Sequence, residues 1–330
     1  DNTQDAVEVE HGVVIVATGA REYEPREYLY GKDSRVITQR ELEKKLATGN
    51  SELRTLNSVV MIQCVGSRNG DHPYCSRVCC SQAVKNALQL KEQNPETDVF
   101  VLYRDMRTYT FREVHYRQAK QEGVVFMNYD KGEPPDVVAT GDGLKVCTLD
   151  PVLHENLMID ADLVVLSPCI IPQDTNEELS RMLKVPLNDD GFFLEAHVKL
   201  RPVDFATEGV FLAGMAHSPK SADETISQAK AAAARACTII SQKKYMAEPT
   251  IAAVNEDICD GCGICHPVCE YGAIEIVAEV VEGEERKKAK LTEALCKGCG
   301  GCVAACPSGA MEQKGFKSEQ LVAMIDAALE

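Results

Sequence analysis

Tryptophan is absent from this sequence, and only 5% of its residues are aromatic, although 45% are apolar. The scarcity of aromatic residues says little about class, while the apolar fraction allows a substantial core in two or three domains. No apolar run approaches the ~20 residues of a membrane-spanning helix. No signal peptide is visible after Asp1. We therefore expect no membrane insertion.

Basic residues are outnumbered by acidic ones, 35 to 51, which gives a formal net charge of −16. Such a surface repels nucleic acid and anionic membranes, so we expect no nucleic-acid partner. A disulfide scaffold is also not expected, because most of the 15 cysteines stand at spacings typical of metal clusters. These features together predict a cytoplasmic protein in a reducing compartment.

Eight of the cysteines form two blocks near the C-terminus, each with the spacing C-x2-C-x2-C-x3-C. The blocks are Cys259, Cys262, Cys265 and Cys269, and Cys296, Cys299, Cys302 and Cys306. This spacing is typical of proteins with two [4Fe–4S] clusters, in which three thiolates of a block bind one cluster and the fourth binds the other. The sequence therefore predicts a protein that moves single electrons.

The crossed pattern predicts two ligand sets. One is Cys259, Cys262, Cys265 and Cys306, and the other is Cys296, Cys299, Cys302 and Cys269. The flanking residues repeat as well, which indicates a duplicated half-unit, although Glu270 stands where a proline is usual. Structural zinc is the alternative, but a zinc ion takes four ligands and needs no repeated run of this kind. Iron and acid-labile sulfide analysis separates the two.

Apolar runs alternate with helical patterns in the rest of the chain. Residues 58–64 and 98–103 read as buried strands, and a helix expected over residues 76–92 makes them a βαβ unit. Another strand, at residues 209–214, precedes an alanine-rich helix over residues 221–242. The fold class predicted from this order is α/β.

The C-terminal part is expected to be a small α+β ferredoxin domain with two clusters. Residues 243–250 read as the linker to it, and residues 282–285 read as a hairpin tip between its halves. A final helix over residues 318–329 carries an apolar stripe that we expect to pack on the core.

A further cysteine set lies in the expected βαβ unit: Cys64, Cys75, Cys79 and Cys80. The strand-to-helix turn of such a unit commonly carries glycines that bind a pyrophosphate, and here only Gly66 remains. A helix start suits an anionic cluster, because its free N–H groups and dipole favour negative charge. We favour a third [4Fe–4S] cluster, since adjacent cysteines reach two irons of one cube more readily than one ion. A redox dithiol with Cys79 or Cys80 as nucleophile, or inert buried thiols, are the alternatives.

Six further cysteines and histidines show no ligand spacing. We expect the three cysteines to be small core residues and the three histidines to have structural roles. They are Cys147, Cys169 and Cys237, and His115, His154 and His217.

The strand at residues 209–214 leads through a loop into a helix, as in flavoproteins with two dinucleotide-binding domains. With the Ala-Thr-Gly turn ending at Gly19, this resembles the thioredoxin-reductase-like fold. Met215 replaces the aspartate that usually holds the ribityl chain. No G-x-G-x-x-G precedes residue 17, so the half-domain for the ADP end of FAD is missing and the fold is expected to be partial.

The vicinal-cysteine run, the Ala-Thr-Gly turn, the Ala-Gly-x-x-x-x-Pro-Lys loop ending at Lys220 and the double block occur here in one order. Together they resemble the C-terminal part of the A subunit of heterodisulfide reductase, an iron–sulfur flavoprotein of methanogens. The resemblance implies FAD, several [4Fe–4S] clusters and flavin-based electron bifurcation. Electrons would arrive from a hydrogenase or formate dehydrogenase through a small iron–sulfur partner. They would leave to CoM-S-S-CoB through the B and C subunits of heterodisulfide reductase, and to ferredoxin.

Carried onto this chain, the resemblance implies a cluster on the vicinal-cysteine set near a flavin. The residues implied to contact the flavin are Gly19, Gly214, Met215, Lys220, Thr225 and Gln228. Lys220 would stabilise anionic reduced flavin, and a surface lysine that caps a loop is the alternative. The expected domains are residues 1–50 with 168–245 for FAD, 51–167 for the βαβ unit, and 246–330 for the ferredoxin domain.

Two other functions remain open. The same fold can feed another acceptor, in sulfur metabolism or in the reduction of aromatic thioesters. Alternatively, the chain is a passive ferredoxin-like wire, and the presence or absence of flavin separates this interpretation from the others.

Overall fold

Five strands form a parallel sheet in the order β3-β10-β4-β5-β6, and the first four carry buried apolar side chains. They are β3 (Val36–Thr38), β10 (Leu163–Pro168), β4 (Ser58–Val65), β5 (Asp98–Tyr103) and β6 (Val125–Asn128). The computed structural model describes residues 8–141, 143–244, 250–281 and 284–329. The central strands β4 and β10 are buried almost throughout, which is typical of parallel strands covered on both faces.

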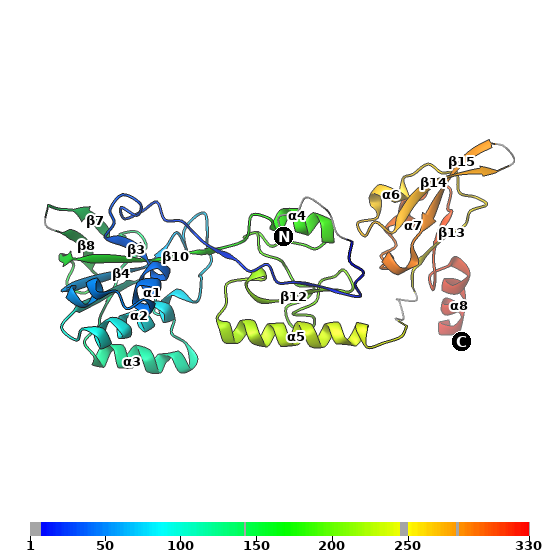
Figure 1. The fold of residues 1–330 in the computed structure, drawn as a ribbon. Coiled ribbons are helices and arrows are strands. Elements are labelled where there is room, and N and C mark those ends of the chain that lie inside the picture. The colour runs from blue at the N-terminus through cyan, green and yellow to red at the C-terminus, as the bar shows by residue number, and fades with distance from the viewer. Residues whose placement is uncertain (1–7, 142, 245–249, 282–283, 330) are drawn as a thin grey trace.

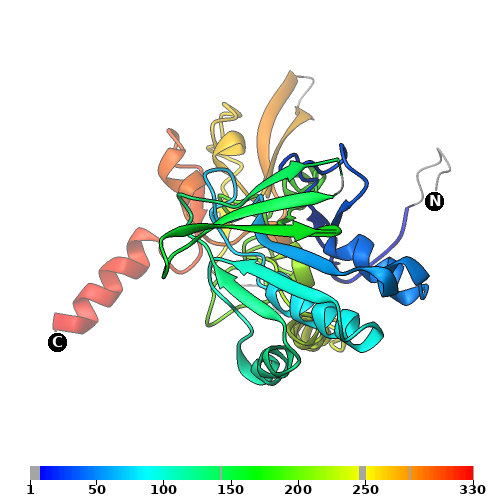
Figure 2. The ribbon, with the colours of Figure 1, turned by 90° about the vertical axis from the view of Figure 1, so that its left-hand side faces the viewer.

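Different layers cover the two faces of this sheet (Figures 1 and 2). Val59 and Met61 of β4 pack toward helices α1 (Gln39–Ala47), α2 (Cys79–Gln93) and α3 (Glu113–Gln121). Val60 and Ile62 pack toward an antiparallel sheet. Its strands are β7 (Asp136–Ala139), β8 (Leu144–Asp150) and β9 (Glu155–Ala161). The consecutive elements β4, α2 and β5 form the βαβ unit that the amino-acid sequence predicts, and the α/β class is confirmed.

The boundary expected at residue 50 is wrong for this sheet. β3 pairs in parallel with β10, and α1 follows directly after it. Thr38 and Glu41 form a reciprocal capping box that begins α1 at the edge of the sheet. Residues 36–47 therefore belong with the βαβ unit. The sequence did not reveal this, because a short edge strand carries too few apolar residues to be recognised.

A smaller part joins segments from before and after the sheet. β1 (Val14–Val16) pairs in parallel with β12 (Val210–Leu212), and β2 (Arg21–Glu22) pairs with β11 (Ile170–Ile171). Helix α5 (Ala222–Ile240) packs on β12, and α4 (Asn176–Leu183) closes the other side (Figure 1). The chain thus passes from this part into the sheet after β2 and returns to it after β10.

The C-terminal part is built from two similar halves. Strands β13 (Ala252–Val254) and β16 (Met311–Gln313) pair, and β14 (Ile274–Val281) pairs with β15 (Glu284–Leu291). Short helices α6 (Cys265–Val268) and α7 (Gly301–Ala305) pack against each other. The hairpin between β14 and β15 has the predicted place, although tip residues 282–283 and linker residues 245–249 lie outside the described residues.

Helix α8 (Ser318–Leu329) projects from this part (Figure 2) and buries no residue. Its apolar stripe is solvent-exposed, with Leu321 at 42% and Ile325 at 58% exposure, so the prediction that it packs on the core is wrong. The spacing of apolar residues predicts a stripe on this helix, but it does not show which part of the chain, if any, covers that stripe. Among the described residues, no helix is long and apolar enough to cross a membrane.

Candidate functional site: three cysteine sets and a buried lysine loop

A narrow cavity in the C-terminal part is lined by cysteines of both blocks. They are Cys259, Cys262, Cys265 and Cys306. Ile276 of β14, Ala289 of β15 and Met311 of β16 contribute apolar walls. The structure therefore brings together three thiols of the first block and the last thiol of the second, which is the first ligand set that the sequence predicts.

A second cavity repeats this arrangement in the other half. Its cysteines are Cys269, Cys296, Cys299 and Cys302. Ala252, Ile274 and Leu291 close its apolar side. Burial raises the pKa of Cys302 to about 11, and the charges of the neighbouring Cys296 and Cys299 raise it further.

Two glycines let the loops fold tightly around these cavities. Gly261 and Gly298, at equivalent positions of the blocks, have φ of +66° and +63°. A Cβ atom would lie 2.0 Å from the Lys287 carbonyl oxygen at the first and 2.4 Å from that of Thr250 at the second. Both loops therefore need glycine for backbone conformation and for close approach.

Backbone N–H groups point at two sulfurs of the second cavity. The amide of Ala252 donates to Cys296 Sγ, and that of Ala273 donates to Cys269 Sγ, each at 3.3 Å. Such donors stabilise thiolate charge and fit the sulfur atoms of an iron–sulfur cluster.

No group of three or more His, Cys, Asp or Glu side chains among the described residues is placed to hold a single metal ion. Four thiolates that each bind a different iron lie farther apart than four ligands of one ion. The two cysteine-lined cavities are compatible with [4Fe–4S] clusters. This fit rests on their donor sets and, in the second cavity, on the N–H groups that point at its sulfurs.

The third cysteine set lies where β4 gives way to α2. Cys64 lies near the end of the strand with a left-handed φ of 62°, and Cys79 and Cys80 form the first turn of the helix. Burial raises the pKa of Cys64, and the nearby Cys80 and Cys75 raise it further. The four thiols therefore lie close enough to act on one another, and their role as cluster ligands stays a prediction.

Cys79 and Cys80 differ in their electrostatics. The hydrogen bond between them raises the pKa of Cys79, which is also deeply buried, and lowers that of Cys80. A lowered pKa suits either a metal-binding thiolate or a nucleophile, so this difference alone does not choose between the two interpretations.

A buried guanidinium nitrogen lies beside this set. Nη1 of Arg68 has no partner within hydrogen-bond distance among the described residues, and the charge of Arg68 opposes the rise in the pKa of Cys64 that burial causes. A cluster with sulfide acceptors would provide what this donor lacks, so the residues present fit that group.

One cysteine beside this set was not recognised in the sequence as part of it. Cys169 is fully buried, as expected of a core residue, but it accepts from Ser76 Oγ at 3.5 Å. Its thiol lies close enough to Cys75 and Cys64 for their charges to raise its pKa, after burial. Cys147 is half-buried in β8, and Cys237 is exposed on α5, so the core role expected for Cys237 is wrong.

The loop between β12 and α5 is organised around a buried lysine. Lys220 is 8% exposed and donates to Gly214 O at 3.0 Å, to Ser218 Oγ at 3.3 Å and to His217 Nδ1 at 3.2 Å. The alternative of a surface lysine is therefore wrong. Burial lowers the pKa of Lys220 to about 8, with Arg77 lowering it further and two carboxylates opposing.

Other residues predicted to contact a flavin fix the same loop. Gln228 of α5 accepts from the Gly214 amide at 2.8 Å and lies 2.9 Å from His217 Nδ1. A Cβ on Gly214, whose φ is +72°, would lie 3.3 Å from the methyl group of Thr225. Met215 is half-buried in the loop, and Gly19, with φ of +74°, lies in the loop that follows β1.

A cavity of about 410 Å³ lies between the lysine loop and the third cysteine set. It is lined by Cys75 and Pro219, which belong to predicted motifs, and by residues that the sequence did not single out, because they come from distant parts of the chain. The latter are mainly Tyr74, Arg77, Tyr109 and Phe192. Aromatic walls with arginine beside them suit a flat, electron-rich ring.

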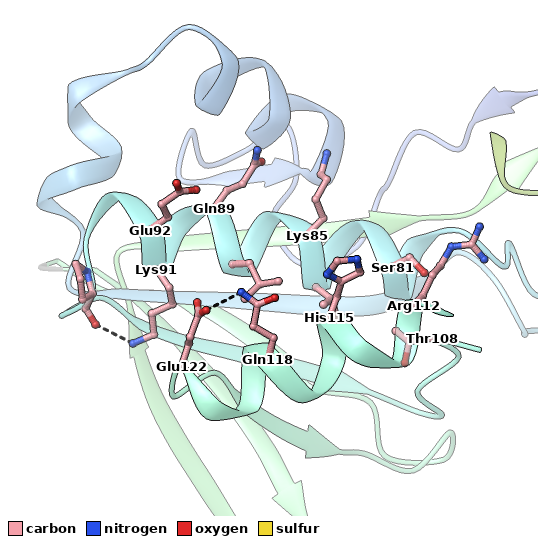
Figure 3. Close-up of a pocket in the computed structure, with 13 residues that line it drawn as sticks. Ser81, Lys85, Gln89, Lys91, Glu92, Thr108, Arg112, His115, Gln118 and Glu122 are labelled. Carbon is pink, nitrogen blue, oxygen red and sulfur yellow. Dashed lines mark hydrogen bonds between the residues drawn. The ribbon is translucent and has the colours of Figure 1, made fainter. Parts of the chain in front are cut away.

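A larger groove of about 920 Å³ runs between α2 and α3 (Figure 3). None of the predicted site residues lines it. Its charges are of both signs, and several are already engaged: Lys91 donates to Pro95 O at 2.9 Å, and Gln118 donates to Glu122 at 2.8 Å. Although this groove is larger than the cavity beside Lys220, its lining residues do not suit a redox centre.

Comparison with known proteins identifies the C-terminal part of the chain first. Residues 258–310 match the family described as "4Fe-4S dicluster domain". Because this stretch holds both cysteine blocks, the C-terminal part is a 4Fe–4S dicluster domain, and the chain is an iron–sulfur protein.

Relatives extend over the whole chain. The A subunit of the H(2):CoB-CoM heterodisulfide,ferredoxin reductase of Methanothermobacter marburgensis is 41% identical over 100% of this chain and 51% of its own length. The iron–sulfur A subunit of the CoB–CoM heterodisulfide reductase of Methanocaldococcus jannaschii is 38% identical over 100% of this chain and 52% of its own. The chain is thus a homologue of the A subunit of heterodisulfide reductase, and it spans about half the length of these relatives.

Among solved structures, thioredoxin reductase of T. acidophilum is similar with a TM-score of 0.45 at 15% identity. That similarity covers 69% of this chain and 64% of the reductase.

Proposed function

We propose that this chain is the iron–sulfur flavoprotein part of a heterodisulfide-reductase-type oxidoreductase, and that it corresponds to the C-terminal part of the A subunit of that enzyme. It would carry electrons between FAD and three [4Fe–4S] clusters. One observation carries the proposal: two cavities each collect three cysteines of one block and the fourth of the other. This is the ligand pattern of an electron-carrying pair of clusters.

The protein's own residues have distinct tasks in this proposal. The two crossed sets hold the clusters of the dicluster domain, and Cys64, Cys75, Cys79 and Cys80 hold the third. FAD, when bound, supplies the exchange between two-electron and one-electron transfer. The buried ammonium of Lys220 places a positive charge in the lysine loop, which favours an anionic ligand, and its pKa of about 8 lets it release a proton near neutral pH.

The names of the relatives support the partners proposed for this chain. Those names include CoB–CoM heterodisulfide, ferredoxin and H2, so we propose flavin-based bifurcation of electrons between CoM-S-S-CoB and ferredoxin. The B and C subunits of heterodisulfide reductase and a small iron–sulfur partner of hydrogenase or formate dehydrogenase would flank this chain in the cytoplasm. The dicluster domain would be the port between a partner and the interior.

Anaerobic copurification tests this proposal. The expected result is a complex that contains an acid-releasable flavin and a cysteine-rich, heterodisulfide-cleaving subunit. Copurification with a different reductase would favour another acceptor, in sulfur metabolism or aromatic thioester reduction. A preparation with clusters but without flavin, even with a candidate N-terminal partner co-expressed, would favour the passive wire and refute bifurcation.

A further inference from the structure

Arg77 lies between two predicted cluster ligands and has an unusual backbone. It follows Cys75 closely and precedes Cys79, and its φ of 62° is left-handed, which is uncommon for a residue with a side chain. Its amide donates to Cys75 Sγ at 3.3 Å. The backbone of Arg77 is thus part of the third cysteine set.

Its side chain reaches the other site. Nη1 donates to Pro219 O at 3.3 Å, in the loop that carries Lys220. Nη2 donates to Glu224 Oε1 at 2.5 Å and to the Tyr109 hydroxyl at 3.1 Å. Glu224 in turn accepts from the Ser221 amide at 2.9 Å in the capping box of α5. One guanidinium therefore fixes the lysine loop and the start of α5 to the cysteine loop.

We propose that Arg77 is a positioning residue shared by the third cluster and the flavin, which sets their mutual placement and stabilises the reduced state of both with one positive charge. This inference rests on the proposed function. It goes further, because it names a single residue through which the two redox centres are coupled.

The surroundings of Arg77 support a long-range electrostatic role. Its charge is one cause of the lowered pKa of Lys220, second to burial, so its field extends across the loop. It also lines the cavity between the two sites, together with Cys75 and Pro219. Since a reduced cluster and a reduced flavin carry more negative charge than the oxidised forms, a nearby cation raises both midpoint potentials.

Three variants separate charge, geometry and surface effects. Arg77→Asn removes the charge and keeps a residue that tolerates positive φ. Arg77→Lys keeps the charge and loses the fork of donors. Arg112→Asn is the matched control, because Arg112 also pairs with the first turn of α5, through Asp223, and also lies over Tyr109, at 5.6 Å from the ring centroid.

The test is a redox titration of the full anaerobic complex, with the clusters followed by EPR and the flavin by visible absorption. Arg77→Asn should shift the midpoint potentials of the third cluster and of the flavin to more negative values. Arg77→Lys should shift them less, and Arg112→Asn should leave both unchanged. Iron and flavin content are measured for every variant.

The outcomes distinguish this inference from the proposed function. Wild-type protein without a third cluster or without flavin would refute both. Normal iron and flavin with unchanged potentials in Arg77→Asn would refute the role of Arg77 alone. A shift of the same size in Arg112→Asn would also overturn it, because the effect would then belong to the general charge of this surface.

Discussion

Cys306 lines the same narrow cavity as Cys259, although it follows Cys302 within its own block. Cys269 makes the opposite crossing into the cavity of Cys296. Each half of the dicluster domain therefore completes the cysteine set of the other, and neither half has a full set alone. We expect the two halves to depend on each other when clusters assemble.

Pairs of cysteine-to-alanine substitutions test this crossing. Cys259→Ala with Cys306→Ala should remove the signal of one intact [4Fe–4S] cluster, because both residues belong to one set. Cys296→Ala with Cys306→Ala should remove two. Counting intact clusters by Mössbauer spectroscopy measures the difference. The reverse result, with two clusters lost in the first double variant and one in the second, would show that the sets are not crossed.

The third cysteine set should hold a cluster of its own. Replacing Cys80 by alanine should lower the iron content by about four atoms per chain, since a cubane holds four irons. Cys237→Ala is the control, because that thiol is exposed on α5. Unchanged iron in the Cys80 variant, with loss of reactivity toward thiol reagents, would support a redox dithiol in its place.

Gly66 should be essential to the shape of the third site. Its φ is +68°, and an added Cβ would lie 2.4 Å from the Tyr23 ring. Gly66→Ala should lower the free energy of unfolding by about 1–3 kcal/mol through backbone strain alone. Gly70→Ala is the matched control, because no atom lies within 4 Å of its added Cβ. Equal unfolding curves in urea for both variants would contradict this account.

Lys220 should make stability depend on pH in one window. Its pKa is about 8 in the folded chain against 10.5 as the ordinary value. Between these values the unfolded state binds more protons, so stability rises as pH rises through about 8 and levels off near 10.5. The Lys220 amine is surrounded by His217, Glu195, Arg77 and Glu224. These four residues are the same in wild type and in a Lys220 variant, so their own titration cancels to first order when the two proteins are compared.

The measurement compares the free energy of unfolding of wild type and Lys220→Met in urea from pH 7 upward. The difference between the two proteins should grow in favour of wild type across the window. Parallel pH dependences would mean that Lys220 keeps an ordinary pKa in the folded protein.

Much of this site could be predicted from sequence, because cysteine spacing is a local pattern with a direct chemical meaning. The crossed sets and the βαβ unit that carries Cys64 and Cys79 are examples. The contacts of Arg77 with Pro219 and Glu224 were not predictable, since they join residues far apart in the chain. The burial of Lys220 and the exposure of α8 also depend on tertiary packing, which periodicity does not reveal.

Metal and sulfide analysis of the anaerobically purified chain tests the central claim most directly. Three cubanes predict about twelve iron and about twelve acid-labile sulfide atoms per chain. About eight of each would remove the third cluster and keep the dicluster domain. Zinc without sulfide would contradict the account.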